Sequence, residues 1–126
     1  MLSPGEVIHI CVSTTPEPKY KFLICIDFAD GFYLYISTDP GRNTGSSVPI
    51  LRRELPALAY DSHVGLEVMA MDRNQVSEAL EQDERAGKKG SIDASAADRI
   101  IQGARRYKVM PRWHKRRIDE ALSQVK

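Results

Sequence analysis

The sequence predicts an α+β fold in which a small barrel or strongly bent sheet of about five β-strands is followed by three helices. Up to residue 71 the apolar residues form short runs rich in β-branched and aromatic side chains, whereas beyond residue 72 they recur at helical spacing. The chain has 126 residues, of which 42% are hydrophobic and 28% are charged, as in a globular protein with a core. We therefore expect one domain, 1–126, with the sheet in 1–71 and a helical extension in 72–126.

The first three strands are predicted from runs of β-branched and aromatic residues at 7–12, 20–27 and 32–38. A polar, proline-containing segment at 13–19 predicts a loop between the first two strands. Asp30 and Gly31 are the residue pair expected in a tight hairpin turn, so the second and third strands should be antiparallel neighbours.

The rest of the sheet is predicted from weaker signals. Residues 39–47 contain Gly, Pro and hydroxyl residues and predict an exposed loop. A short edge strand is expected at 48–51. A last strand is expected at 64–71, because every second residue from Val64 to Ala70 is apolar.

Three helices are predicted from their start signals. Asp72 can cap the first, with Gln75 completing a capping box, and Gly87 should end it. Residues 87–90 then form a flexible connector. Asp93 can cap the second helix, and Pro111 suits the first turn of the third. The expected core-facing positions of the last two helices are Ala97, Ile100, Ile101, Ala104, Ile118, Ala121, Leu122 and Val125.

Charge is divided unequally along the chain. Residues 99–126 hold nine Lys/Arg and two Asp/Glu, a net charge of +7, whereas residues 1–98 carry a net charge of −6. Such asymmetry indicates an anionic partner, with nucleic acid as the first candidate.

The densest part of this region is a basic cluster in which seven of 13 residues are Lys or Arg. Its cations could bind phosphate, and Trp113 could stack on unpaired bases. The alternative is that the cations pair with acids of the same chain, at Glu78, Glu81, Asp83 and Glu84. The cluster's candidate nucleic-acid-binding residues are Arg105, Arg106, Lys108, Arg112, Trp113, Lys115, Arg116 and Arg117.

A second set of candidates lies at strand ends. Lys19 and Lys21 begin the second strand, while Ser37 and Thr38 end the third, and an antiparallel arrangement can place both pairs at one end of the sheet. A cation beside a hydroxyl could bind and polarise a phosphodiester. The alternative is that the lysines only solubilise the surface and the hydroxyls start a turn. His63, just before the last strand, is a separate candidate general base.

Other classes of site are not supported. His9, Cys11, Cys25 and Asp27 could form a metal-binding patch if Cys11 faced Cys25 and His9 faced Asp27, but free cysteines are usually small buried apolar residues. We expect no metal and no cofactor. No apolar run approaches the roughly 18–20 residues of a membrane span, and no secretory signal or disulfide framework is present, so we expect a cytoplasmic protein without a membrane partner.

Over about residues 4–71 the chain resembles the MazF/PemK-like toxins. The resemblance is carried by Pro4-Gly5-Glu6-Val7 opening a strand, by the strands at 21–26 and 32–38, and by Asp61-Ser62-His63-Val64 ahead of a later strand. It implies an SH3-like barrel and a sequence-specific endoribonuclease that cleaves single-stranded RNA without metal. It also implies a homodimer that is neutralised by an antitoxin protein.

Carried over to this sequence, the resemblance matches Thr38 or Ser37 to the hydroxyl residue that ends the family's third strand. The family's arginine in the first loop has no arginine here, so Lys19 or Lys21 would take its place with a point charge instead of a planar fork. The leading hypothesis is thus an RNA-cleaving toxin. The alternative is a non-catalytic module of SH3-like fold that binds nucleic acid or protein.

Overall fold

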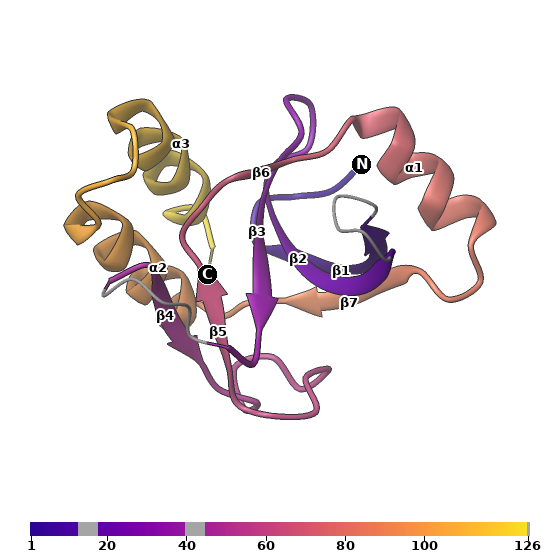
Figure 1. Ribbon diagram of the computed structural model, residues 1–126, viewed down its shortest axis with the longest axis horizontal. Helices are drawn as coiled ribbons and strands as arrows, with labels where there is room; N and C mark the ends of the chain where they lie inside the picture. Colours follow the sequence, from indigo (N-terminus) through magenta and orange to yellow (C-terminus); the bar gives the residue numbers. More distant parts are fainter. Residues whose placement is uncertain (13–17, 40–44, 126) are drawn as a thin grey trace.

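A computed structural model describes residues 1–12, 18–39 and 45–125, and shows one antiparallel sheet with helices on both of its faces (Figure 1). Along the sheet the strands follow the order β4-β5-β3-β2-β1-β7, and β6 pairs with β3 beside β5. The predicted α+β class is confirmed. Within the described residues the sheet has seven strands, where the sequence predicted about five, and it is not closed into a barrel.

The strands are β1 Glu6–Val12, β2 Lys19–Asp27, β3 Phe32–Ser37, β4 Ser47–Ile50, β5 Ser62–Gly65, β6 Met69–Ala70 and β7 Gly87–Ser91. The helices are α1 Arg73–Gln82, α2 Ala94–Arg106 and α3 Arg112–Leu122. None of the helices in the described part of the chain is long and apolar enough to cross a lipid bilayer. Most of the predicted loop at 13–19, and the middle of the one at 39–47, lie outside the described residues.

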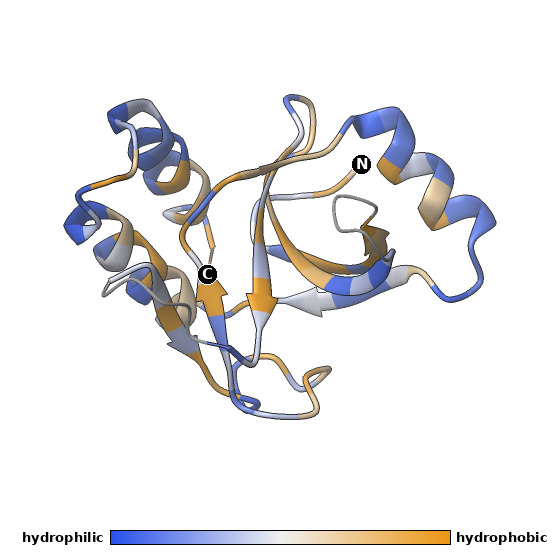
Figure 2. Cartoon of the chain, in the orientation of Figure 1, coloured by the Kyte–Doolittle hydropathy of each residue, from blue (hydrophilic) through white to orange (hydrophobic). Residues whose placement is uncertain are grey.

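Alternating residues of the central strands enter two different cores. Ile24 and Leu34 belong to the larger core, which α2 and α3 cover, whereas Leu23 and Tyr33 belong to the smaller core, which α1 covers near β1. All four side chains are fully buried. Figure 2 shows the resulting pattern, with apolar residues along the strands and polar residues on the outer sides of the helices.

The helix caps predicted at Asp72 and Asp93 are confirmed, whereas Pro111 is the N-cap residue of α3 and not part of its first turn. The Asp72 side chain accepts hydrogen bonds from the backbone N–H of Asn74 at 2.8 Å and of Gln75 at 3.3 Å, at the start of α1. The Asp93 side chain accepts one from the N–H of Ala96 at 2.8 Å, at the start of α2. The core-facing positions predicted for α2 and α3 are buried, with Val125 partly so.

Two predictions about residues 72–91 are wrong. The first helix ends at Gln82 rather than at Gly87, and residues 87–90 are not a connector but belong to β7, which pairs antiparallel with β1. The glycines of this segment have low strand propensity, but the exposed edge of β1 offers backbone partners that outweigh it. Lys88 and Lys89 then occupy the new sheet edge, where charge opposes further strand pairing.

The tight turn between β2 and β3 forms where Asp30 and Gly31 predicted it. Gly31 has a φ of +72°, and its carbonyl oxygen accepts a hydrogen bond from the N–H of Met71 at 2.8 Å. A Cβ atom on residue 31 would lie 2.2 Å from the carbonyl oxygen of Met71. The turn therefore requires glycine both for its conformation and for the close approach of the chain after β6.

We predict that Gly31→Ala lowers the free energy of unfolding by at least about 3 kcal/mol, because it combines a left-handed backbone with a steric clash. Gly45→Ala is the matched control, since Gly45 has a φ of +80° with nothing within 4 Å of its Cβ position. Gly45→Ala should lower the free energy of unfolding only by the cost of placing alanine in a left-handed backbone conformation, about 1 kcal/mol. Urea unfolding of both variants would test this, and equal losses would contradict the account.

Candidate functional site

Three of the predicted catalytic residues lie in a row across neighbouring strands. The register of β3 and β5 sets Ser37 directly opposite His63. The register of β2 and β3 pairs Phe22 with Ile36, so its continuation by one residue sets Lys21 beside Ser37. Opposed residues of antiparallel strands have Cβ atoms about 4.5–5.5 Å apart and side chains on one face. We call Lys21, Ser37 and His63 the polar row.

The polar row lies on the smaller-core face of the sheet, because Lys21 is paired with Ile10 of that core. On this face α1 packs against β1 and not over β5, and all three side chains of the row remain partly exposed. The ammonium nitrogen of Lys21 lies 5.5 Å from the centre of the Tyr35 ring, which holds the cation above the sheet. The row is therefore accessible from solvent.

The other two predicted catalytic residues lie at the same end of the sheet. Lys19 is paired with Val12, so it shares a face with Lys21, and Thr38 follows Ser37 directly; both side chains are exposed. The hydroxyl oxygen of Ser37 accepts a hydrogen bond from the backbone N–H of Asp39 at 3.1 Å. That bond fixes the oxygen while leaving the hydroxyl proton available for donation to a ligand.

Sequence reasoning missed one component of this surface, Tyr35. Its ring lies over Gly65 of β5, where a Cβ atom would be only 2.7 Å from a ring carbon. Gly65 thus makes room for an aromatic side chain beside the polar row. The alternation of aromatic residues along β3 was visible in the sequence, but the glycine that accommodates Tyr35 lies on another strand.

An ammonium group, a hydroxyl and an imidazole in one row are the groups needed to act on a phosphodiester. The cation can stabilise negative charge on the phosphoryl oxygens, and the hydroxyl can donate a hydrogen bond to one of them. The imidazole can accept a proton and return it.

The basic cluster lies elsewhere. It is carried by the end of α2, the turn that follows and α3, which pack on the larger-core face. Helix α3 is tied to the sheet where β2 ends, through Arg117 and Asp27 at 2.5 Å, and Asp27 is six residues from Lys21 along β2. That spacing corresponds to about 20 Å. The structure therefore does not bring the basic cluster and the polar row into one site.

Several cations of the basic cluster are already engaged within the chain. Arg117 binds both Asp27 and Asp30, and these hydrogen bonds and charges raise its pKa, with the bond to Asp30 contributing most. Arg105 forms an ion pair with Asp119 at 2.5 Å, and the ammonium group of Lys115 donates to the carbonyl oxygen of Arg105 at 3.1 Å. Part of the cluster thus holds α2, α3 and the β2–β3 turn together.

The acids predicted as intramolecular partners are not the ones used. Glu78, Glu81, Asp83 and Glu84 belong to α1 and the residues just after it, and α1 lies on the other side of the sheet from α2 and α3 (Figure 1). Asp83 instead accepts a hydrogen bond from the hydroxyl of Tyr20 at 2.5 Å. The prediction paired the two most highly charged stretches of sequence, but the fold separates them.

Within the described residues, no ion pair or hydrogen bond engages the side chains of Arg106, Lys108, Arg112 and Arg116.

The strand pairing on which a metal-binding patch would depend is not formed. Cys11 is opposite Tyr20 rather than Cys25, and His9 is opposite Phe22 rather than Asp27. The rings of His9 and Phe22 stack with centres 4.5 Å apart. In the part of the chain that the structure describes, no three His, Cys, Asp or Glu side chains are grouped as a metal site would require.

Burial has a large effect on the protonation of two residues of this set, Cys25 and His9. It raises the pKa of the Cys25 thiol to about 12, so this thiol stays protonated and packs as an apolar side chain. Burial, and then the charges of Lys89 and Arg85, lower the pKa of His9, which is therefore largely neutral at pH 7.

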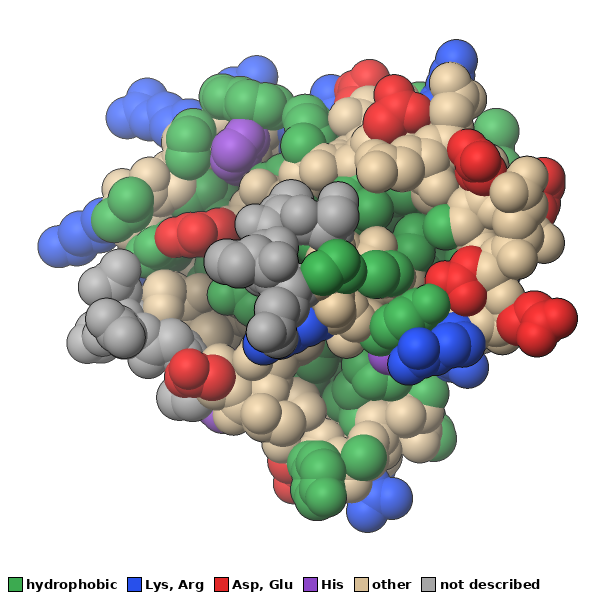
Figure 3. Space-filling model, turned by 45° about the vertical axis from the view of Figure 1, so that its right-hand side comes forward, with side chains coloured by type: hydrophobic (Ala, Val, Ile, Leu, Met, Phe, Trp, Pro, Cys, Tyr) green, Lys and Arg blue, Asp and Glu red, His purple; other side chains and the backbone are tan. Residues whose placement is uncertain are grey.

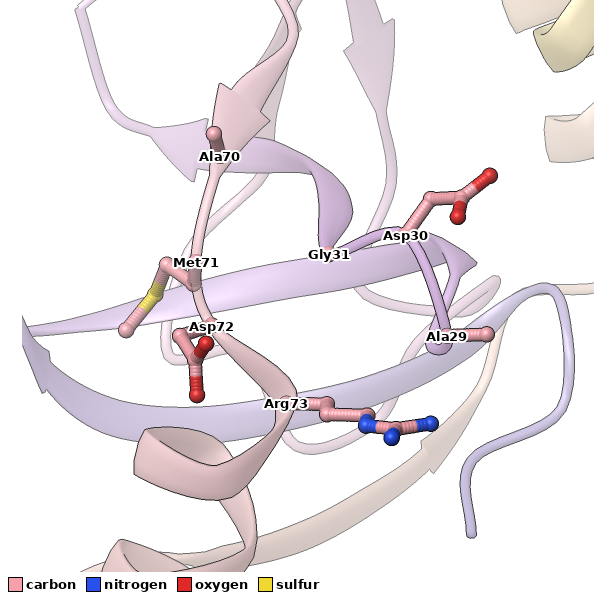
Figure 4. A pocket seen from close by; sticks show the side chains of 7 residues that line it. All are labelled: Ala29, Asp30, Gly31, Ala70, Met71, Asp72 and Arg73. Carbon is pink, nitrogen blue, oxygen red and sulfur yellow. The ribbon is translucent and has the colours of Figure 1, made fainter.

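A hollow of about 520 Å³ lies between the β2–β3 turn and the start of α1 (Figure 4). Its two carboxylates already have structural roles. Asp72 caps α1, and Asp30 binds Arg117. Only Arg73 remains without such a role among its charged lining residues, so the hollow offers little for catalysis.

The first basic residue of the C-terminal region, Arg99, has a structural role. Its guanidinium group binds both carboxylate oxygens of Glu54, at 2.8 and 3.0 Å, and the carbonyl oxygen of Pro49 at 3.0 Å. Glu54 is only 6% exposed. The hydrogen bonds from Arg99, more than any other cause, lower the pKa of Glu54. This pair joins α2 to the segment between β4 and β5.

No model of a known protein family matches the chain, and no curated protein sequence matches it.

We predict that Arg99→Met costs about 2–4 kcal/mol of stability at pH 7, because it leaves the buried Glu54 carboxylate without its partner. In the wild type the lowered pKa of Glu54 contributes stability above the unfolded pKa of about 4.3, and that contribution is lost as the pH falls through the folded pKa. In the variant, burial should raise the pKa of Glu54 above the unfolded value, so protonation favours the folded state.

The difference in stability between wild type and Arg99→Met should therefore narrow as the pH falls from 7 to 4, which urea unfolding at several pH values would measure. Arg105→Met is the control. The Asp119 partner of Arg105 is more than a third exposed, so this variant should lose much less stability than Arg99→Met. A constant difference across this pH range would contradict the assignment.

Proposed function

We propose that the protein is an endoribonuclease of the MazF/PemK-like kind, which cleaves single-stranded RNA at the polar row. The observation that supports the proposal is the register that sets Ser37 opposite His63 and beside Lys21. In this proposal strands β1 to β6 correspond to the SH3-like barrel of the resemblance, and the segment from α1 onward is an extension of it.

The proposed reaction uses the ribose 2′-hydroxyl as nucleophile. The imidazole of His63 takes the proton from this hydroxyl while its oxygen bonds to phosphorus, and the bond from phosphorus to the 5′-oxygen breaks. The leaving oxygen receives a proton from the imidazolium. The products are a 2′,3′-cyclic phosphate and a 5′-hydroxyl end, and the scheme requires no metal.

Lys21 and Ser37 would stabilise the charge that develops in this reaction. The Lys21 ammonium group offsets the additional negative charge on the phosphoryl oxygens, and the Ser37 hydroxyl positions one of them by a hydrogen bond. Lys19 and Thr38, at the same sheet end, would contact the neighbouring phosphates. The basic cluster lies at the far end of β2, on the other face of the sheet, and would take no part in the cleavage step.

The resemblance extends the proposal to the protein's setting. It implies a homodimer whose activity an antitoxin protein neutralises, and the low number of cysteines supports a cytoplasmic location for it. The second candidate function is a non-catalytic module that binds nucleic acid or protein. It is favoured by the four cations at Arg106, Lys108, Arg112 and Arg116, which engage no other described residue, and by lysine at the position where the family has arginine.

We predict that His63→Ala lowers the rate of RNA cleavage by at least about 100-fold, because it removes the proton acceptor. Lys21→Met should lower the rate by a similar factor, since it removes the charge that stabilises the transition state. The measurement is cleavage of a panel of single-stranded oligoribonucleotides, with end analysis for cyclic phosphate.

Lys108→Met is the matched control for Lys21→Met, because it removes the same charge from an exposed position on the other face. It should leave the cleavage rate within about twofold. Growth arrest on expression of the wild type, relieved by His63→Ala, would support the same conclusion in cells. Cleavage by the His63→Ala variant at the wild-type rate, or no cleavage of any oligonucleotide by the wild type, would overturn the proposal.

A further inference from the structure

A small apolar groove lies between the α2–α3 turn and the segment that joins β5 to β6. It has a volume of about 210 Å³ and is lined mainly by Leu66, Val68, Tyr107, Val109, Met110 and Pro111. The lining comes from two segments distant in sequence, so the groove exists only in the folded chain. It lies on the opposite side of the sheet from the polar row and has no part in the proposed cleavage.

Two large apolar side chains stand exposed beside this groove. Val109 is 75% exposed and Trp113 is 52% exposed, although most other large apolar residues of the described chain are buried. Trp113 is held in place by the edge of His114, with ring centres 4.0 Å apart, and by Phe32 at 5.5 Å. An exposed, positioned tryptophan beside an apolar hollow is typical of a protein interaction surface.

The surroundings of the groove are cationic. Arg106, Lys108 and Arg112 each adjoin a lining residue in sequence, and Arg116 lies one helical turn beyond Arg112. These four side chains engage no described residue of the chain. The first turn of α3 contains no acidic residue, so the positive end of the helix adds to the field. Figure 3 shows green side chains among projecting blue ones on this side of the molecule.

We propose that this groove binds an acidic, amphipathic segment of a partner protein, which places one apolar side chain against Val109 and Trp113 and its carboxylates toward Lys108 and Arg112. The charge of the rim selects an acidic partner. The aliphatic lining selects a peptide over RNA, because the polar edges of a nucleobase would lose their hydrogen bonds in the groove. The Glu67 carboxylate also borders the groove, from the segment between β5 and β6, so the carboxylates of the peptide would lie toward the α2–α3 turn. The inference does not depend on RNA cleavage.

The test is selection from a phage library of random 12-residue peptides on the whole protein at pH 7.5, with depletion on Val109→Asp. We expect enriched peptides to carry several Asp or Glu around a large apolar residue. Trp113 is the only tryptophan of the chain, and its ring contacts that of His114, which lines the groove, so its fluorescence should respond to a ligand bound there. Burial lowers the pKa of His114, so this neighbour stays neutral at pH 7.5 and does not change the signal itself.

A synthetic peptide from the selection should change Trp113 emission saturably. The double variant Lys108→Glu, Arg112→Glu should weaken its affinity at least tenfold. Reversal of two exposed cations on α1 and β7, Arg73→Glu with Lys89→Glu, is the matched control and should change it less than twofold. The His63→Ala variant should bind as the wild type does, which separates this inference from the proposed cleavage.

Three results would overturn the inference. The first is that no peptide binds the wild type in preference to Val109→Asp. The second is that the enriched peptides contain no acidic residues. The third is a single-stranded oligoribonucleotide that displaces the peptide and itself changes Trp113 emission at lower concentration, which would make the groove an RNA surface. Urea unfolding of each variant checks that it folds, as expected for changes at exposed residues.

Discussion

The burial of β1, β2 and β3 on both faces is the constraint on which the rest of the structure depends. Leu23 and Ile24 are neighbours in sequence, yet each is fully buried in a different core. A shift of one residue in strand register would exchange the two sets of side chains, and neither α1 nor the α2–α3 pair would then meet the surface that fits it. The register is thus fixed from both sides.

That register also decides which residues remain at the two ends of the sheet. At one end it sets Lys21, Ser37 and His63 side by side on a face that α1 does not extend to cover. At the other end it presents Asp27 and, after the turn, Asp30 to Arg117 of α3. The same pairing therefore leaves one end polar and accessible, while the other end anchors the helices.

Features set by neighbouring residues could be predicted from the sequence, and features set by distant ones could not. The hairpin at Gly31 and the caps at Asp72 and Asp93 depend on residues within a few positions, and all three were predicted. The pairing of β7 with β1, and that of Ser37 with His63, join segments far apart in the chain. For the same reason Lys21 and Ser37 could be expected at one end of the sheet from the sequence, but the position of His63 opposite Ser37 could not.

The distribution of charge shows why a net value is a weak guide to a partner. The C-terminal region carries a net charge of +7, but Arg99, Arg105 and Arg117 bind carboxylates of the same chain and hold elements together. The exposed cations near the α2–α3 turn surround an apolar groove rather than forming a continuous basic channel. A polyanion needs such a channel along its backbone, whereas a folded or extended acidic peptide needs an apolar anchor point with charges beside it. The surface that remains after internal pairing therefore has the chemistry of a protein interface.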